Sequence, residues 1–196
     1  MALPEIVRAT VEDRAAINAT ITLAFAADPV NRWYLRDADS YLKYFPKVVD
    51  LFLTPSIESS SCFMTTDRTG AALWLPPGVT ADEEAADAIF GEACPPDLLD
   101  EFGAFMTGIE SYHPHDDDCW YLPLVGVDPA YQGLGLGGAI MKAANAAIDE
   151  NGNLSYLEAS SESNAALYAR HGFEVLGEVQ TGSSPIARPM LRPRQN

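Results

Sequence analysis

Residues 119–138 read CWYLPLVGVDPAYQGLGLGG, a strand pattern followed by a glycine-rich turn. The first nine residues are mostly apolar and β-forming, which predicts a strand. The alanine-rich residues 137–150 predict a helix, and Asn151-Gly152 is its C-cap signal. Glycines between strand and helix can turn their backbone N–H groups toward one point, where the helix dipole also favours an anion. The stretch therefore predicts a cradle for a phosphate group.

Two phosphate-binding patterns overlap in this turn. Gly133, Gly135 and Gly138 fit the G-x-G-x-x-G of dinucleotide-binding folds, whereas Gln132, Gly135 and Gly137 fit Q-x-x-G-x-G. A Walker loop is excluded, because no Lys-Ser/Thr pair closes the glycines. On spacing alone, a turn used only for close packing of helix against strand also stays open.

The residues before the glycines separate the two patterns. A dinucleotide fingerprint needs its first glycine directly at a strand end, but residues 128–132 stand between. Glu158 lies where a ribose-binding acid would be found, which favours the dinucleotide pattern. The chain after Gly138 is nevertheless too short for the further parallel strands of such a fold. The Q-x-x-G-x-G pattern is therefore favoured.

The strand before the turn is predicted to be irregular. Pro123 cannot donate a ladder hydrogen bond, and Gly126 is a weak strand former. Both indicate a bulge that splays this strand from a neighbour and frees backbone groups for a ligand. An edge irregularity without function is the alternative.

The rest of the chain shows no linker, so one mixed α/β domain is expected. Thr10 and Asp13 resemble a capping box opening a helix that stops near Asp28-Pro29. In the next helix, with Leu42, Phe45, Val49 and Phe52 as its apolar residues, Pro46 predicts a kink or break. The remaining predicted elements are strand 5–10, hairpin 61–78, helices 81–93 and 97–112, strand 154–159, helix 164–172, strand 173–179 and strand 187–192.

Composition limits the partners and the compartment. With 28 acidic and 12 basic residues the formal charge is −16, which repels nucleic acids and predicts no such partner. The same charge attracts a cationic amine or serves solubility alone. We expect no membrane association and a cytoplasmic location, since no long apolar run or leader pattern is present. Cys62, Cys94 and Cys119 have no paired spacing and are expected to be free, mostly buried thiols.

The segment HPHDDDC (residues 113–119) raises the question of a metal site. His113 and His115 have a spacing found in some metal sites, but no second ligand cluster stands at a recognisable distance in the sequence. A solvated acidic loop is the favoured interpretation, and no metal is predicted.

Three segments together resemble one family. They are the order VDPAYQGLGLG at residues 127–137, the strand before it, and NAALYARHGF at residues 164–173 after the next strand. This block, from about Trp120 to Val179, is similar to the GNAT superfamily of acyl-CoA-dependent N-acetyltransferases. The opening IVRATVEDRAAI is also typical of it. The HPH…WYLPLVGVDPAYQGLGLG block and GAALWLPPG resemble the branch that contains puromycin N-acetyltransferase.

The resemblance implies a single-domain GNAT fold over residues 1–196. In it, helices flank a central, twisted, mostly antiparallel sheet with a splayed strand pair. Residues 1–118 would form the acceptor-side half and residues 119–180 the acetyl-CoA-binding core. Acetyl-CoA would be the co-substrate and a small-molecule primary amine the acceptor, and a homodimer is common in the superfamily. The implied cofactor contacts are Val125, Gly126, Val127, Gln132, Gly133, Leu134, Gly135, Leu136, Gly137, Gly138 and Asn164.

Two residues are expected to be catalytic. The resemblance places Tyr168 at the thioester sulfur, four residues after Asn164 and so on the same helix face. A phenol there could protonate the leaving thiolate. Glu158 is the leading base or water-positioning residue, with Glu110 and His113 as further candidates. A backbone amide near Val125 would polarise the carbonyl.

The acceptor pocket is expected from the N-terminal half, which helps to form it in the superfamily. Aromatic residues there suit a bulky or aromatic amine. The candidate acceptor contacts are Trp33, Tyr34, Trp74 and His113. The alternative function is a non-catalytic module that binds or senses acyl-CoA.

Overall fold

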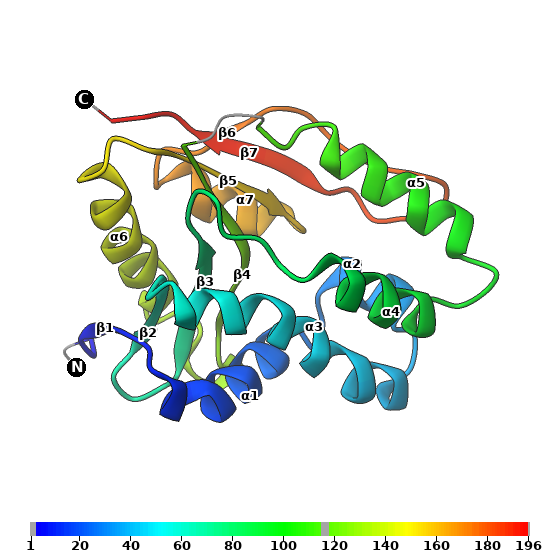
Figure 1. Ribbon diagram of the computed structural model, residues 1–196, viewed down its shortest axis with the longest axis horizontal. Coiled ribbons are helices and arrows are strands. Elements are labelled where there is room, and N and C mark those ends of the chain that lie inside the picture. The colour runs from blue at the N-terminus through cyan, green and yellow to red at the C-terminus, as the bar shows by residue number, and fades with distance from the viewer. Residues whose placement is uncertain (1–2, 115–117, 196) are drawn as a thin grey trace.

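The computed structural model describes residues 3–114 and 118–195, and its core is one twisted seven-stranded sheet (Figure 1). The strand order is β1-β2-β3-β4-β5-β7-β6, and among the described pairs only β4 and β5 run parallel. The strands are β1 (Ile6–Arg8), β2 (Cys62–Thr65), β3 (Gly70–Leu75), β4 (Cys119–Val127), β5 (Leu154–Ala159), β6 (Glu174–Val175) and β7 (Arg188–Arg192). The expected mixed α/β fold, with helices flanking a mostly antiparallel sheet, is confirmed.

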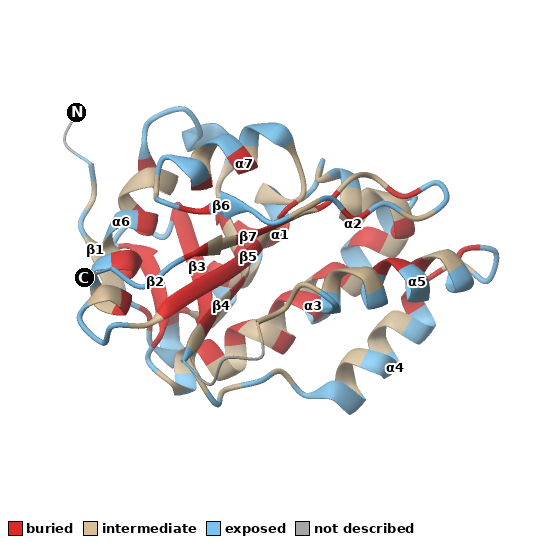
Figure 2. Cartoon of the chain, turned by 90° about the horizontal axis from the view of Figure 1, so that it is seen from above, coloured by how far each residue is buried: buried red, intermediate tan, exposed pale blue. Residues whose placement is uncertain are grey.

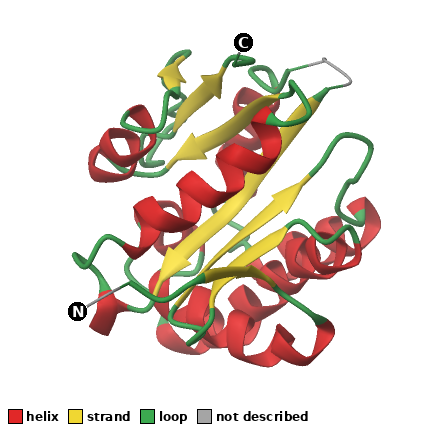
Figure 3. Cartoon of the chain, turned by 90° about the vertical axis from the view of Figure 1, so that its left-hand side faces the viewer, coloured by secondary structure: helices red, strands yellow, loops and turns green. Residues whose placement is uncertain are grey.

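Helices cover both faces of the sheet, and Figure 3 shows α6 on one side of it and the N-terminal helices on the other. The helices are α1 (Arg14–Ala24), α2 (Pro29–Tyr34), α3 (Ala38–Glu58), α4 (Glu83–Ala93), α5 (Leu99–Glu110), α6 (Leu136–Asp149) and α7 (Glu162–Ala169), with 3₁₀ turns η1 (Val11–Asp13) and η2 (Pro129–Tyr131). Buried positions gather on the strands and on the inner stripes of the helices, while α4 is mostly exposed (Figure 2).

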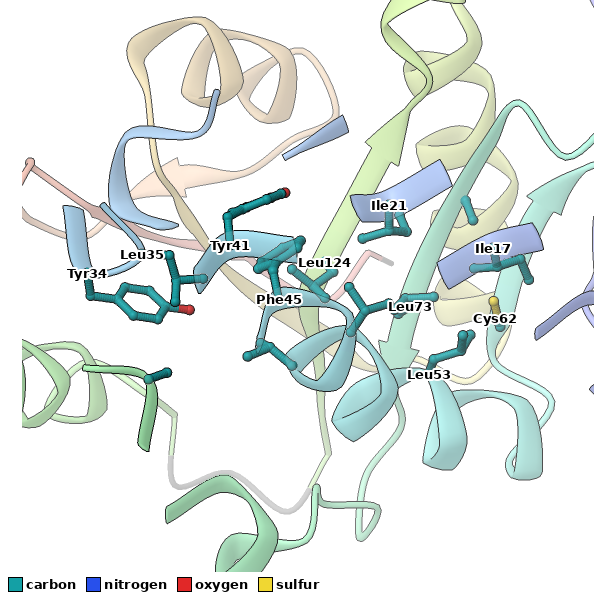
Figure 4. Packing of buried hydrophobic residues seen from close by; sticks show 14 of the residues in the cluster. Ile17, Ile21, Tyr34, Leu35, Tyr41, Phe45, Leu53, Cys62, Leu73 and Leu124 are labelled. Atoms are coloured by element: carbon teal, nitrogen blue, oxygen red, sulfur yellow. The ribbon is translucent and has the colours of Figure 1, made fainter. Parts of the chain in front are cut away.

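Strand alternation produces two separate core clusters. Cys62 and Leu73 face α1 and α3, where Ile17, Ile21 and Phe45 fill the space between helices and sheet (Figure 4). Neighbouring strand positions, among them Phe63, Ala72 and Trp74, point to the other face and pack with α6. Side chains that alternate between two covered faces explain why β2 and β3 are buried throughout.

The predicted bulge in β4 is present and has a clear effect on side-chain direction. Leu75 pairs with Tyr121 and Leu73 with Leu124, so β4 holds one residue more than β3 between these pairs. Before the extra residue, Leu122 packs into the cluster with α6; after it, Leu124 packs into the cluster with α1. The bulge thus exchanges the faces on which even- and odd-numbered residues of β4 lie.

The predicted splay between β4 and β5 is also present. Parallel pairing joins Cys119–Leu122 to Leu154–Leu157 and goes no further, whereas pairing with β3 continues to Val127. One edge of residues 123–127 therefore has no strand beside it among the residues that the structure describes. Gly126 is needed on the face toward α1, because a Cβ there would lie 2.6 Å from that of Ala24.

A break at Pro46 is ruled out, because α3 is one helix that contains both Pro46 and Pro55, while a kink there stays a prediction. Proline removes one internal hydrogen bond, but burial of Tyr41, Phe45 and Val49 against the sheet and α1 outweighs that loss. The buried stripe includes Tyr41, whereas the predicted Leu42 is 64% exposed.

Some other helix and strand ends agree with the predicted ones, and some differ for local reasons. The capping box is confirmed, since Asp13 accepts from the Thr10 backbone N–H at 3.1 Å. The first long helix ends at Ala24, and Asp28 instead caps the next one. The predicted strand 173–179 contains only Glu174–Val175 and an isolated bridge from Val179 to Ala187.

Candidate functional site

Two adjoining cavities lie beside the splayed end of β4. The first, here called the loop groove, measures about 660 Å³ and is lined by the glycine turn, β4 and α7. The second, the strand cavity, measures about 160 Å³ and lies along β4, β5 and α5. Five residues line both cavities and mark their junction: Phe25, Asp28, Val125, Asn164 and Tyr168.

The glycine turn has the backbone shape of an anion cradle. Gly133 and Gly135 have positive φ values of 77° and 87°, and α6 begins at the next residue, Leu136. The side chain of Gln132 donates to the Val127 carbonyl at 3.0 Å, so it fastens the turn to the end of β4. Backbone N–H groups at the start of α6 are thereby left to face the loop groove.

Gly135 offers a direct test of this geometry. In Gly135→Ala we expect a loss of about 1 kcal/mol in unfolding free energy, because a Cβ disfavours left-handed backbone. Steric overlap is excluded as the cause, since the added Cβ would come no closer than 4.0 Å to a neighbour. Urea titration measures the effect, with Gly91→Ala inside α4 as the control; equal stability of Gly135→Ala and wild type would contradict the prediction.

The remaining predicted cofactor residues lie around the same groove, with one exception. Val125, Gly126 and Val127 form its strand wall, and Asn164 lies on its α7 side. Leu134 is 54% exposed and lines neither cavity. The Ser161 hydroxyl accepts from the Asn164 backbone N–H at 3.2 Å and caps α7 at this wall.

Arg170 also lines the loop groove, although the sequence reasoning assigned the cradle no basic side chain. It is exposed and donates to the Ala166 carbonyl at 2.9 Å. The signal available in the sequence was its position two residues after Tyr168, at the end of the helix that was already assigned to the cofactor.

Asp28 is the second functional candidate that the sequence reasoning missed. It caps α2, and its Oδ1 accepts from the backbone N–H and from Nδ2 of Asn31, both at 3.0 Å. Its Oδ2 accepts from the Ser160 hydroxyl, which in turn accepts from Asn164 Nδ2 at 3.3 Å. Asp28 thus joins the N-terminal half to the ends of β5 and α7.

Glu158 lies in the wall of the strand cavity with an unusual set of neighbours. Its Oε2 accepts from the Tyr121 hydroxyl at 3.0 Å, while Oε1 is buried and has no partner among the described residues. Burial raises the pKa of Glu158 to about 7; the phenols of Tyr121 and Tyr156 oppose the shift, and Glu110 adds to it. This carboxyl group can therefore exchange a proton near neutral pH.

Tyr168 lies at the junction and is 7% exposed. Burial, with the charges of Asp28 and Glu158, raises its pKa well above the ordinary value. The phenol therefore keeps its proton throughout the neutral range and can act only as a donor of that proton.

The four predicted acceptor residues line neither cavity. Trp74 is fully buried against Trp120, with ring centroids 6.4 Å apart, so its packing assigns it to the core. Tyr34 is also a core residue, and Trp33 donates to the Ser183 hydroxyl at 3.1 Å. His113 packs on Tyr121 and Tyr156 and so stands behind the wall that holds Glu158.

Neither a metal cluster nor a membrane-spanning helix is found in the part of the chain that the structure describes. His115, the partner considered for His113, lies outside the described residues. Cys62 and Cys94 are buried free thiols, and burial raises the pKa of Cys62 to about 12.

Comparison with known proteins finds a matching family model and a similar protein. Residues 100–175 match the family model described as an acetyltransferase (GNAT) domain. An uncharacterized N-acetyltransferase of Schizosaccharomyces pombe is 24% identical over 186 residues, which cover 85% of this chain and 72% of that protein.

Solved structures share the fold over nearly the whole chain. One titled histone acetyltransferase HPA2 and related acetyltransferase, from Corynebacterium glutamicum, has TM-score 0.71 and 24% identity, covering 100% of this chain and 98% of that one. Arylalkylamine N-acetyltransferase 2 of Aedes aegypti has TM-score 0.68 and 12% identity, with coverage of 96% and 98%. A polyamine N-acetyltransferase of Drosophila melanogaster has TM-score 0.63 and 13% identity, with coverage of 95% and 98%.

Proposed function

We propose that this chain, which contains a GNAT acetyltransferase domain, transfers an acetyl group from acetyl-CoA to a primary amine of a small molecule. The observation that carries the proposal is the junction of the two cavities at Val125 and Tyr168. A thioester in the loop groove and an amine in the strand cavity would meet there. The fold is shared by an arylalkylamine N-acetyltransferase and a polyamine N-acetyltransferase, which supports an amine acceptor.

The residues of the loop groove fit acetyl-CoA. The turn at Gly133 to Gly138 offers backbone N–H groups and the positive end of α6 to a pyrophosphate. The unpaired edge of residues 123–127 has the geometry to add the amide-bearing arm as an extra strand. Asn164 would donate to the same arm. We assign the cofactor core to residues 119–180 and the acceptor side to residues 1–118, with Phe25 and Asp28 reaching across to the junction.

The bound thioester supplies an activated acetyl group, and the amine attacks it directly in a ternary complex. Glu158, with a pKa of about 7, takes a proton from the incoming ammonium, directly or through one water molecule. Tyr168 donates its proton to the departing sulfur and regains one from the nitrogen, which loses its second proton as the amide forms. A backbone N–H near Val125 faces the carbonyl oxygen as negative charge develops on it.

Calorimetric titration with acetyl-CoA tests the cofactor, and release of thiol over a broad panel of amines tests the reaction. We expect binding, and transfer to at least one primary amine. Absence of binding at millimolar acetyl-CoA would overturn the proposal. Binding without transfer to any amine would favour the alternative of a non-catalytic module that senses acyl-CoA.

Arg170→Gln is expected to weaken acetyl-CoA binding about threefold, because an exposed ion pair contributes only modestly. The effect should shrink in 0.5 M salt, because the salt then screens the attraction between exposed charges. Lys142→Gln, an exposed charge on α6 that lines neither cavity, is the control. Equal affinities of Arg170→Gln and wild type at low salt would remove Arg170 from the site.

Three further properties are inferred from the sequence alone. The first is membership of the branch with puromycin N-acetyltransferase, which residues 113–137 and 70–78 resemble. The second is a homodimer, and the third is a cytoplasmic location; all three stay predictions. The resemblance to this branch favours a small molecule over a protein as the acceptor. Sedimentation velocity measures the second property directly.

A further inference from the structure

The charge of the side chains that line the strand cavity indicates which kind of acceptor fits there. Its lining includes two carboxyl groups, those of Asp28 and Glu158, and no Lys, Arg or His side chain among the described residues. A cavity with this charge pattern favours a cation and repels an anion.

The two carboxyl groups line the same cavity near the end of β5. Glu158 is in β5, Ser160 comes directly after the last residue of that strand, and both side chains line the strand cavity. The Ser160 hydroxyl donates to Asp28 Oδ2, which brings that carboxylate to the end of β5. Asp28 lines both cavities, whereas Glu158 lines only the strand cavity, so Asp28 is the nearer to the junction.

Both carboxyl groups retain capacity to accept hydrogen bonds. Asp28 accepts three among the described residues, out of about four that a carboxylate can accept. Glu158 Oε1 is buried without a hydrogen bond from a described residue, so either the neighbouring Tyr156 hydroxyl, which also has none, or a ligand can donate to it. An ammonium group has three donors and can satisfy both residues.

The remainder of the strand cavity has an apolar part and neutral polar side chains, but no further charge among the described residues. Val30 of α2, Phe105, Met106 and Ile109 of α5, and Leu124 of β4 supply the apolar part; the neutral polar side chains are those of Asn31, Tyr121, Ser160, Asn164 and Tyr168. Such a wall offers nothing to pair with a second charge, so the part of the acceptor beyond its amine should be uncharged and apolar.

We infer that the acceptor is an alkyl or arylalkyl primary amine without a carboxylate, and that Asp28 binds its ammonium group at the junction of the two cavities. This inference rests on the proposed function for its reaction, but the binding site can be tested without turnover. Amino acids are poor acceptors, because their carboxylate would lie beside Asp28 and Glu158.

The test compares phenethylamine with 2-phenylethanol, its neutral counterpart, by calorimetric titration in the presence and absence of CoA. We expect wild type to bind the amine at least about tenfold more tightly, the effect of one charged hydrogen bond. Phenylalanine, which adds only a carboxylate, should bind at least about tenfold more weakly than phenethylamine.

Asp28→Asn is the main variant, because asparagine is an equally good N-cap and keeps α2 in place. We expect it to reduce the preference for amine over alcohol to less than about threefold, with the affinity for alcohol unchanged. Ser160→Ala, which removes the hydrogen bond that positions Asp28, should lower the same preference by a smaller factor. Asp87→Asn, at an exposed position of α4, is the matched control.

The outcomes separate this inference from the proposed function. Equal binding of amine and alcohol to wild type, an unchanged preference in Asp28→Asn, or tighter binding of phenylalanine would each overturn it. A preference of about tenfold or more for 1,4-diaminobutane over butylamine would also overturn it, since the apolar wall would then hold a second cation. Acetyl-CoA binding and thiol release report on the proposed function independently.

Discussion

Replacing Glu158 by glutamine is expected to lower kcat/KM about a hundredfold, the usual contribution of a positioned general base. In wild type, kcat/KM should rise as pH increases through about 7, where Glu158 loses its proton. Glutamine cannot ionise, so the variant should lose this step while a step caused by the amine itself remains. Initial rates of thiol release between pH 5.5 and 9 measure both effects.

The same substitution should stabilise the fold at high pH. Glu158 ionises near 7 in the folded chain but has an ordinary value of 4.5, so between these values the folded state holds a proton that the unfolded state has released. Stability therefore falls as pH rises through this window, by about 3 kcal/mol at most. We expect Glu158→Gln to be more stable than wild type at pH 8.5 and to lose this advantage at pH 4.

Glu83→Gln, at an exposed position in the first turn of α4, is the control for both measurements. An unchanged pH profile in Glu158→Gln would remove Glu158 from proton transfer. The base would then be sought among the groups that surround it, which are Glu110, His113 and Asp28.

Tyr168→Phe is expected to lower kcat about a hundredfold while the KM for acetyl-CoA changes little. The phenol is buried at the junction, and its raised pKa keeps it protonated. It is therefore available to donate a proton as the sulfur departs. Phenylalanine keeps the ring and its edge contact with Phe173, whose centroid lies 6.1 Å away. The fold should therefore survive the change.

The measurement is single-turnover acetyl transfer, which isolates chemistry from product release. Tyr44→Phe, on α3 and outside both cavities, is the control. An acetyl donor with a strongly acidic leaving thiol should restore part of the rate, because such a thiolate needs no proton. A rate for Tyr168→Phe within twofold of wild type would disprove the general-acid assignment.

Much of the loop groove could be predicted from the sequence because its signals are local. The glycines at 133 and 135 adopt left-handed backbone, and the strand before them bulges near Pro123, as the residue types require. Asn164 and Tyr168 lie four apart on one helix and do line the same junction. Their roles in binding and catalysis stay predictions.

The strand cavity could not be predicted in the same way. The sequence predicts only that a helix stops near Asp28, which instead caps the next helix, and its contact with Ser160 brings it to the junction. Trp74 and Tyr34 are aromatic residues in the expected half of the chain, yet both are packed into the core. Residue type predicts that a side chain prefers burial, but not whether its neighbours leave a cavity beside it.

Local rules of backbone geometry therefore account for the elements, the bulge and the phosphate-type turn, since each depends on residues a few positions apart. The pairing of Asp28 with the end of β5 and the junction of the two cavities join residues more than a hundred positions apart. These features exist only after β4 and β5 separate and α2, α5 and α7 close around the gap. The acceptor site is thus a product of packing, because no short segment holds more than one side of it.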